Sequence, residues 1–374
     1  MVMTQIGMKE RIEEYLKNSL GVPLRLLSIK ELGLGLELES KRKEEIKGFG
    51  YGKPYFVTFE TSEGERKEVV ISSLKGDSFG HEYPSDRAQI LIWQYRAFNS
   101  LPEHVKALDV GYFTNDGRLI STRDAAEYFI VCEKVEGEEY VHDLDRLRGG
   151  ARLREEDEAR VSALASYLVD IHSRKGKDAN LYIRRIRELL GHSECIFGLT
   201  DSYPSESEVI TQAELKEIEK LCIEWRWKLK MKKDRLCMVH GDFHPWNVIF
   251  HTRTGTDFTL LDRSRGEWGE AADDVTAMTI NYLFFGLMKT DGAVIDSDFK
   301  RLYELFFDVY LAKTKDYELL EVLQPFYAFR GLVVASPLWY PNISMATRKK
   351  LFNFIKNVLQ TEEFNYRDVD GYLD

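Results

Sequence analysis

Residues 238–250 read MVHGDFHPWNVIF. Within this segment, Asp242 is followed five positions later by Asn247, which opens an apolar run typical of a strand. A second apolar run at 258–261 ends at Asp262, and the residues between the two runs are typical of a hairpin turn. The spacing therefore predicts a hairpin that brings Asn247 and Asp262 side by side, with Asp242 on the loop before it.

These three side chains suit the chemistry of phosphoryl transfer. In such sites an aspartate accepts the proton of the attacking hydroxyl, while an asparagine and a second aspartate hold the Mg²⁺ ions that bridge the ATP phosphates. The separation of Asp242 from Asn247 matches the kinase catalytic loop, and Asp262 follows where the second metal ligand is expected. A helix-capping aspartate or a turn asparagine would explain one of these residues alone, but not all three in this order.

A family resemblance follows from this segment. The tripeptide His-Gly-Asp at 240–242, the asparagine that follows it and the downstream Asp262 resemble the aminoglycoside phosphotransferase and choline kinase-like family. That family has the protein-kinase-like fold and phosphorylates small molecules. The resemblance implies that Asp242 is the catalytic base and that His240 is part of the catalytic group. It also implies that Asn247 and Asp262 are the ligands of Mg²⁺.

The resemblance continues at residues 269–275, which read GEAADDV. Here the family has an aspartate that opens a helix and steadies the catalytic loop; Asp274 is the closer match and Asp273 is the alternative. The chain departs from the family directly after the metal-binding aspartate, where an aromatic residue is common and this sequence has Arg263. Arg263 and Arg265 would either neutralise phosphate or pair with neighbouring carboxylates.

The pattern along the chain predicts two lobes. Strand-like segments and turns dominate the first part, whereas the part after residue 153 is mostly amphipathic helix. The expected strands are 24–30, 55–59, 69–75, 107–113 and 128–135. The expected helices are 8–19, 86–101, 161–172, 181–190, 213–231 and a buried helix at 277–288. We therefore predict an α+β, protein-kinase-like two-lobed fold, with a nucleotide-binding lobe at 1–135 that contains a small antiparallel sheet, and a larger, mostly helical catalytic and acceptor-binding lobe at 136–374.

The nucleotide is expected on the sheet lobe. Gly48, Gly50 and Gly52 precede the second expected strand, and glycines let backbone amides approach phosphates closely. The same glycines would also suit a flexible hairpin loop. A lysine on the third strand should meet the α- and β-phosphates; we assign this position to Lys75, with Lys67 as the rival.

Two further contacts with the nucleotide are expected. The lysine should pair with a carboxylate on the following helix, for which Asp86 and Glu82 are available. Residues 128–137 resemble the family's hinge, in which an apolar strand is followed by a short acidic segment and a glycine. Backbone groups from Glu133 to Val135 would then face the adenine.

Three other patterns have competing interpretations. His240, Asp242 and His244 alternate like metal ligands on one strand face, but the eight histidines of the chain form no second cluster of the kind that a metallophosphatase needs. Six basic residues within 226–235 would contact acidic partners or form the solvated, cationic end of a helix, and we favour the helix end. Aromatic residues of the C-terminal half would line an acceptor pocket or fill the core, and core is the better expectation.

Composition disfavours several classes of protein. The 374-residue chain is 44% hydrophobic and has a formal net charge of −10, which is unusual for a general nucleic-acid binder. The four cysteines show no CxxC spacing and indicate no disulfide framework. The N-terminus lacks a signal-peptide core, and no apolar run is long enough to span a bilayer. We expect a cytoplasmic protein that contacts neither nucleic acid nor membrane.

The predicted function is an ATP- and Mg²⁺-dependent phosphotransferase that moves the γ-phosphate to a hydroxyl of a small molecule, with Asp242 as the base. A catalytically silent, kinase-like nucleotide-binding or scaffold protein is the alternative, because the lysine and its carboxylate partner are weakly marked. A protein kinase is disfavoured, because the short distance from Asp262 to residues 269–275 leaves little room for a long activation segment. The acceptor stays open at this level: a sugar, an amino alcohol, an amino acid or an antibiotic.

Overall fold

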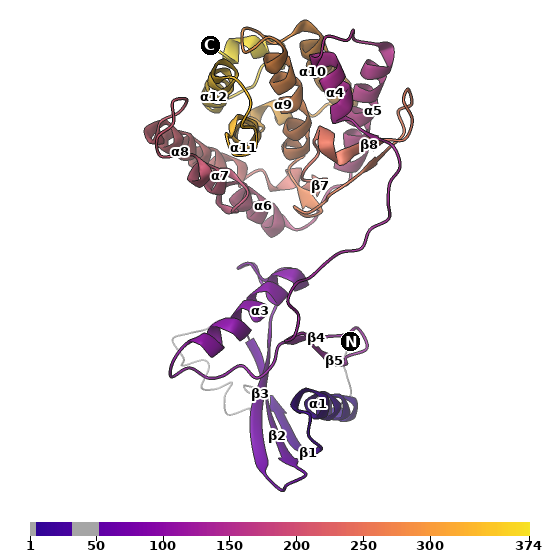
Figure 1. The fold of residues 1–374 in the computed structure, drawn as a ribbon, viewed down its shortest axis with the longest axis vertical. Helices are drawn as coiled ribbons and strands as arrows, with labels where there is room; N and C mark the ends of the chain where they lie inside the picture. The colour runs from indigo at the N-terminus through magenta and orange to yellow at the C-terminus, as the bar shows by residue number, and fades with distance from the viewer. Residues whose placement is uncertain (1–4, 32–51) are drawn as a thin grey trace. The chain divides into compact units, whose positions relative to one another are not determined.

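The computed structural model describes residues 5–31 and 52–374. These residues belong to two units, Met1–Cys132 and Glu133–Asp374. Figure 1 shows a sheet with helices in the first unit and a mostly helical second unit. The predicted α+β class is thus confirmed, with a small antiparallel sheet first and most of the helices after it.

The first unit is built around a three-stranded antiparallel sheet. Its elements are, in chain order, α1 (Gln5–Leu20), β1 (Leu24–Glu31), β2 (Gly52–Thr61), β3 (Arg66–Leu74), α3 (Pro84–Ser100), β4 (Gly111–Phe113) and β5 (Leu119–Ser121). The strand order is β1-β2-β3, and Val57 on the central strand lies opposite Ile29 on one side and Val69 on the other. β4 and β5 form a separate short hairpin.

The core of the first unit lies between α1 and the sheet. Apolar residues on one side of α1 pack against every second residue of the strands. This follows because side chains recur on one face about every 3.6 residues in a helix and every two residues in a strand. The buried side chains of this cluster are Ile12, Leu16, Leu24, Leu26, Val57 and Phe59. The amphipathic helix predicted at 8–19 and the strands predicted at 24–30 and 55–59 therefore have a common core.

The second unit packs helices around two small sheets, ordered β6-β8-β9 and β10-β7. Its elements are, in chain order, β6 (Glu138–Glu139), α4 (Val141–Arg148), α5 (Glu155–His172), α6 (Ala179–Gly191), α7 (Ile196–Ser202), α8 (Gln212–Leu229), η1 (Lys233–Arg235), β7 (Cys237–Met238), η2 (Pro245–Asn247), β8 (Val248–Phe250), β9 (Phe258–Leu260), β10 (Trp268–Gly269), α9 (Ala271–Lys289), α10 (Ser297–Thr314), η3 (Tyr317–Glu321), α11 (Gln324–Ala335), α12 (Met345–Leu359) and η4 (Tyr366–Tyr372). Local sequence sets several of these boundaries; Thr211 and Glu214, for example, form a capping box at the start of α8.

Helix α9 is the centre of the second unit. Nearly every residue from Ala271 to Leu287 is buried, because α9 is covered by α4, α5, α10, α11 and α12. A helix that is apolar all round is buried all round, and the helix predicted at 277–288 is confirmed. Among the described residues, no helix combines the length and the apolar character that a bilayer crossing requires. The first turn of α9 carries Asp273 and Asp274 to the candidate site.

Two expected strands differ from the structure. Residues 128–135 form no strand, and residues 129–131 are 83–88% exposed. Apolar alternation makes a strand only where a neighbouring strand supplies hydrogen bonds, and the described residues supply none here. The strand expected at 107–113 is shortened to β4, because Asp109 instead accepts hydrogen bonds from the side chains of Tyr15 and Ser121.

Candidate active site

The loop before β8 and the β8–β9 hairpin carry the predicted catalytic and metal-binding residues. β8 and β9 pair antiparallel, and the Leu261 N–H donates to the Asn247 carbonyl at 2.9 Å. The predicted hairpin is therefore present, and it places the backbones of Asn247 and Asp262 at neighbouring strand ends. Asp242 lies on the loop between β7 and the 3-10 turn η2.

Glycine and a buried carboxylate shape this loop. Gly241 has φ = +87°, a conformation that favours glycine, and an added Cβ there would lie 3.1 Å from the Cβ of Arg265. The N–H groups of His240 and Gly241 each donate to the Asp274 carboxylate at 2.7 Å. Asp274 is fully buried near the start of α9, where the helix dipole favours negative charge. The contacts that steady the loop thus come from Asp274 rather than Asp273.

A second layer of buried groups supports Asp274. His172 Nε2 lies 3.1 Å from Asp274 Oδ2, and His172 Nδ1 lies 2.8 Å from the Tyr310 hydroxyl. Burial alone would raise the pKa of Asp274, but the hydrogen bond from His172 and those from the loop hold its pKa below the ordinary value. Sequence reasoning missed His172 and Tyr310, since nothing in the local pattern links residues so far apart in the chain.

His240 is a buried part of the loop. It is 4% exposed, and burial lowers the pKa of its imidazole. Its Nδ1 accepts a hydrogen bond from the Asp242 N–H at 3.3 Å. The ring packs edge-on against Phe243, with 5.9 Å between the ring centroids. These contacts fix the backbone of the residue that carries the candidate base.

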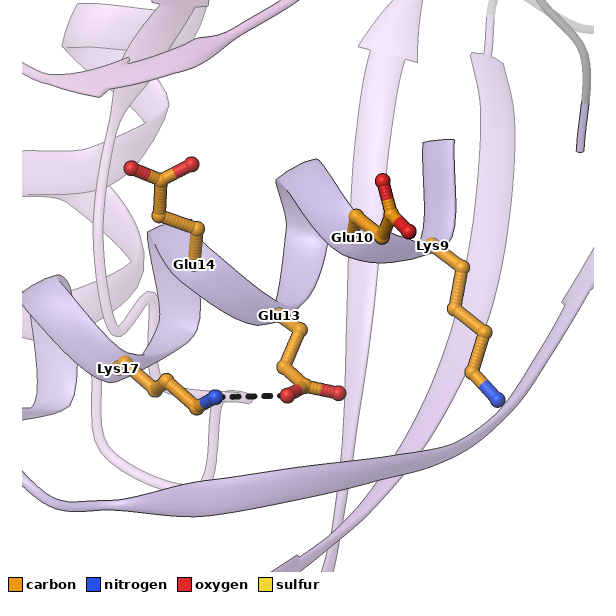
Figure 2. Close-up of a pocket in the computed structure, with 5 residues that line it drawn as sticks. All are labelled: Lys9, Glu10, Glu13, Glu14 and Lys17. Carbon is orange, nitrogen blue, oxygen red and sulfur yellow. Dashed lines mark hydrogen bonds and ion pairs between the residues drawn. The ribbon is translucent and has the colours of Figure 1, made fainter. Parts of the chain in front are cut away.

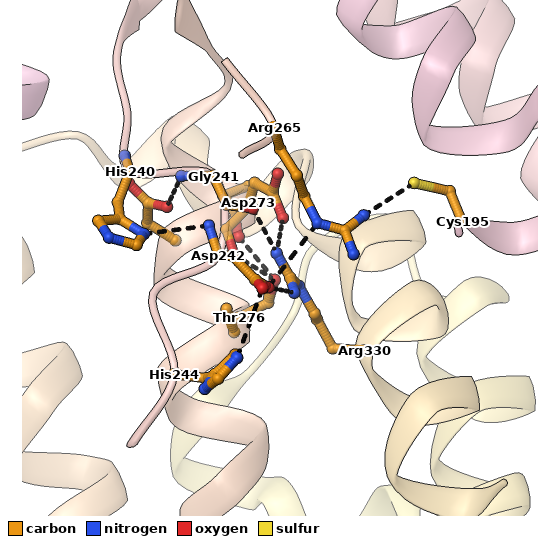
Figure 3. Close-up of polar contacts among 12 residues, drawn as sticks. Cys195, His240, Gly241, Asp242, His244, Arg265, Asp273, Thr276 and Arg330 are labelled. Atoms are coloured by element: carbon orange, nitrogen blue, oxygen red, sulfur yellow. Dashed lines mark hydrogen bonds and ion pairs between the residues drawn. The ribbon is translucent and has the colours of Figure 1, made fainter. Parts of the chain in front are cut away.

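The Asp242 carboxylate is held from two sides (Figure 3). Arg330 Nη1 donates to Asp242 Oδ1 at 2.6 Å, while its Nη2 donates to the Gly241 carbonyl at 2.9 Å and to Asp273 Oδ1 at 2.6 Å. His244 Nε2 lies 3.4 Å from Asp242 Oδ2. Burial raises the pKa of Asp242, but His244 and the positive charge of Arg330 outweigh burial and hold that pKa well below its usual range. Asp242 is therefore ionised and oriented.

Sequence reasoning missed Arg330. It is 5% exposed on α11, and it is the single charged residue of that helix. Burial lowers the pKa of its guanidinium, but Asp273 and Asp242 more than compensate, so its pKa is raised overall. A lone charge in an apolar helix was the available signal, because a buried charge needs a partner. The sequence did not show which carboxylates it would meet.

The predicted metal ligands differ in their surroundings. Asn247 is 9% exposed, and its Nδ2 donates to the Asp242 carbonyl at 3.0 Å. Asp262 is exposed and has φ = +49°, which is uncommon for a residue other than glycine. Backbone conformations of this kind cluster at functional sites. Both side chains offer oxygen ligands that fit Mg²⁺. Of the described residues, no three His, Cys, Asp or Glu side chains are grouped so that they could hold a metal ion, and this includes the alternating set His240, Asp242 and His244.

The two arginines after Asp262 have unusual partners. Arg263 donates to main-chain carbonyls at 2.7–3.2 Å. Arg265 donates to Cys195 Sγ at 3.3 Å and lies 3.7 Å from Glu194 and 3.8 Å from Asp242. In the part of the chain that the structure describes, neither guanidinium therefore pairs with a carboxylate at hydrogen-bond distance.

The residues predicted to contact the nucleotide are described in part. Gly48 and Gly50 lie outside the described residues, and Gly52 opens β2. Lys75 directly follows β3, is exposed, and forms no ion pair within the described ranges. Residues 133–135 follow the exposed apolar segment and have no regular secondary structure. The roles of these residues stay predictions.

Aromatic side chains border the catalytic loop. The Trp246 ring lies 6.1 Å from the rings of Phe285 and Tyr340, and Tyr340 lies 4.9 Å from Phe284, all between centroids. Burial raises the pKa of Tyr340 to about 12. Phe284 and Phe285 are buried in the core, as expected, whereas Trp246 and Tyr340 are half-buried and Trp339 is 60% exposed.

A pocket on α1 in the first unit is lined by charged side chains alone (Figure 2). These residues are Lys9, Glu10, Glu13, Glu14 and Lys17. Lys17 pairs with Glu13 one turn away at 2.7 Å, as is common on solvated helix faces. The pocket contains none of the predicted catalytic residues, so we interpret it as helix surface.

One family model matches more than half of the chain: the phosphotransferase enzyme family, over residues 96–310. No curated protein matches the sequence. Among solved structures, a glucosamine kinase has 16% identity and a TM-score of 0.40, covering 91% of this chain and 92% of its own. A Plasmodium vivax ethanolamine kinase has 14% identity and a TM-score of 0.34, with coverages of 99% and 88%. An ADP-bound aminoglycoside phosphotransferase has 14% identity and a TM-score of 0.32, with coverages of 96% and 98%.

Proposed function

The chain belongs to the phosphotransferase enzyme family, and from this premise we propose that it is a small-molecule kinase that transfers the γ-phosphate of ATP to a hydroxyl group with Mg²⁺. Family membership confirms the resemblance found in the sequence. The observation that carries the proposal is the setting of Asp242. Asp274 holds its loop from the core, and Arg330 keeps its carboxylate charged, while Asn247 follows on the same loop.

In the proposed reaction, Asp242 orients the acceptor hydroxyl and takes its proton. A bond forms between the acceptor oxygen and the γ-phosphorus, the bond from that phosphorus to the β–γ bridging oxygen breaks, and ADP leaves. Transfer of this kind has a loose transition state, so positioning contributes more than base strength. A carboxylate with a low pKa and two fixed oxygens suits that task.

We assign Asn247 and Asp262 as the protein ligands of Mg²⁺. When bound there, Mg²⁺ would neutralise charge on the ATP phosphates and orient them. His240 would act as a positioning residue, because its ring is buried and bonded to the Asp242 N–H. Substitution of His240 would then displace Asp242 rather than remove a proton donor.

The nucleotide-side assignments are part of the same proposal. Gly48, Gly50, Gly52 and Lys75 would hold the ATP phosphates, and the backbone of 133–135 would face the adenine. These assignments rest on the sequence and on the family. The exposed Lys75 forms no ion pair in the described part of the chain, and this observation favours the second candidate, a catalytically silent nucleotide-binding or scaffold protein.

Thermal unfolding with ATP, with and without Mg²⁺, combined with ADP release tests the proposal. A ligand that binds the native state raises the melting temperature, so we expect an Mg²⁺-dependent rise that Asp262→Ala abolishes. Asp242→Asn should keep the rise but lose turnover by roughly 100-fold or more. Asp170→Asn, at an exposed position on α5, is the matched control and should retain both.

The outcomes separate the two candidates. No rise with any nucleotide would support the silent scaffold. Full turnover in Asp242→Asn would show that another group is the base. An ATP-induced rise that needs neither Mg²⁺ nor Asp262 would refute the assigned metal site.

A further inference from the structure

Two arginines approach the same oxygen of Asp242. Arg330 Nη1 donates to Asp242 Oδ1 at 2.6 Å, and Arg265 Nε lies 3.8 Å from that atom. Both guanidinium groups also lie near the ring of Phe329, 4.5 and 5.1 Å from its centroid. Figure 3 shows that they reach one side of Asp242 from different segments, α11 and the loop after β9. Asp242 Oδ1 therefore marks the side of the site on which the two guanidinium groups lie.

The other oxygen of Asp242 lies close to His244, which also contacts the assigned metal ligand Asn247. His244 Nε2 lies 3.4 Å from Asp242 Oδ2 and 3.3 Å from Asn247 Nδ2. If Asn247 binds Mg²⁺, the ATP phosphates belong on this Oδ2 side. An acceptor whose hydroxyl binds Asp242 would then extend the rest of its structure toward Oδ1, where the two arginines lie.

Both guanidinium groups retain hydrogen-bonding capacity. Arg330 Nε and Arg265 Nε are buried and have no hydrogen-bond partner, and the whole Arg330 side chain is nearly buried. Arg330 already binds Asp242 and Asp273, whereas the nearest carboxylate contacts of Arg265 are longer than hydrogen bonds, with Glu194 at 3.7 Å. Buried donors in folded proteins usually have an acceptor, so these two N–H groups indicate a ligand that brings acceptor atoms.

We propose that the phosphoryl acceptor is a hydroxy acid whose carboxylate binds Arg265 and Arg330. The proposal rests on the proposed function and specifies its substrate class. Two unpartnered N–H donors match the two oxygens of one carboxylate, and guanidinium groups form strong, charge-assisted hydrogen bonds with carboxylates. A cationic acceptor would bring a charge of the same sign to these guanidinium groups, and a neutral one would offer only uncharged hydroxyl oxygens, which form weaker hydrogen bonds with them.

Two series of matched acceptors test the proposal on the full chain. D-gluconate, sorbitol and D-glucamine share a polyol skeleton and end in a carboxylate, a hydroxymethyl group and an ammonium group, respectively. D-glycerate, glycerol and 3-amino-1,2-propanediol repeat the comparison on a shorter skeleton. We would measure kcat/KM from ADP release at saturating MgATP, and binding from the melting temperature with MgADP. The acid should exceed its neutral counterpart by roughly 10- to 100-fold in at least one series.

Variants connect this preference to the arginines. Arg265→Met should bring the acid-to-neutral ratio of kcat/KM close to one, mainly through KM, and Arg265→Lys should restore part of the ratio. Arg330→Met should also lower the acid-to-neutral ratio, but it removes the partner of Asp242 and Asp273 and should lower kcat for every acceptor, so Arg265 is the cleaner test. Arg301→Met is the control, because Arg301 pairs with Glu158 on a 53% exposed side chain away from the loop and should keep the wild-type ratio.

The result that would overturn the proposal is an absence of preference for the acids in both series, whether in turnover or in binding. Preference for the ammonium compounds would overturn it as well. Better use of glycerol 3-phosphate than of D-glycerate would show that the arginines serve a phosphate and not a carboxylate. The proposed function is judged by a separate readout, Mg²⁺-dependent ATP binding and acceptor-free ATP hydrolysis, so a kinase that rejects acids would refute this inference alone.

Discussion

Replacing Asp274 with Asn tests whether one buried carboxylate holds the catalytic loop. The Asp274 oxygens accept the N–H groups of His240 and Gly241 at 2.7 Å each, and Oδ2 also contacts His172 Nε2 at 3.1 Å. Asparagine keeps the shape but has a single acceptor oxygen. In either orientation its NH₂ group faces one of the two loop N–H groups, so one buried donor loses its acceptor.

The expected magnitude follows from these contacts. A hydrogen bond to a charged group contributes about 1.5–3 kcal/mol, and a buried donor left unsatisfied costs about 1–3 kcal/mol. The two effects overlap at one site, so Asp274→Asn should lower the free energy of unfolding by roughly 2–4 kcal/mol. Because the loop carries Asp242, a shift of about 1 Å should also reduce turnover by about 100-fold.

Urea unfolding followed by tryptophan fluorescence measures the first effect, and steady-state ADP release measures the second. Asp273→Asn is the informative neighbour, because Asp273 binds Arg330 and its loss leaves the loop amides satisfied. Asp170→Asn on α5 controls for a surface change. If Asp274→Asn unfolds within about 0.5 kcal/mol of wild type and turns over at the same rate, the loop does not depend on this carboxylate.

Three further predictions concern stability and reactivity. Arg235→Met should lower the free energy of unfolding by about 3–5 kcal/mol in urea, because it leaves the fully buried Glu270 without its guanidinium partner; a loss below about 1 kcal/mol would contradict this. The folded state should lose stability as pH falls below about 6.5, because burial lowers the pKa of His240 in the folded state and the unfolded chain then binds more protons. In thermal melts, the melting temperature of His240→Asn should fall less over this pH range than that of the wild type. Thiol labelling at pH 8 followed by mass spectrometry should modify the exposed Cys132 first and Cys195 slowly, since burial raises the pKa of Cys195 to about 11; equal rates would show that Cys195 is accessible.

Much of the fold was predictable because its signals are local. Apolar and polar residues alternate along the short runs near 24–30, 55–59 and 69–75, which are bounded by turns. The structure has β1, β2 and β3 there. The buried helix at 277–288 is apolar all round, and it lies within α9. Residues 128–135 show the opposite case, because their apolar alternation resembles a strand and yet meets no partner strand. The apolar pattern of a segment shows which secondary structure it is able to form. A strand forms there only if a neighbouring strand supplies hydrogen bonds.

The same distinction applies to the candidate site. The sequence by itself determined the order and spacing of Asp242, Asn247 and Asp262, because a short loop and a hairpin set those separations. Tertiary structure decided which residue supports the loop. Asp273 and Asp274 are neighbours that fit the same sequence motif, but Asp274 binds the loop amides and Asp273 binds Arg330. Those choices depend on helices packed around α9, and close packing creates contacts between residues that no local periodicity relates.

The two arginines near Asp242 show most clearly which contacts the sequence alone could not predict. Arg330 lies 88 positions after Asp242, and only the packing of α11 against α9 brings its guanidinium to the carboxylate. From the sequence, Arg265 was equally expected to neutralise phosphate or to pair with a carboxylate. The structure places it close to Asp242 Oδ1, with no carboxylate of the described residues at hydrogen-bond distance. The sequence alone thus determined the reaction class, because phosphoryl transfer needs few residues at fixed spacing. The tertiary structure decided which charged groups surround Asp242, because electrostatic interactions depend on distances between groups that are remote in sequence.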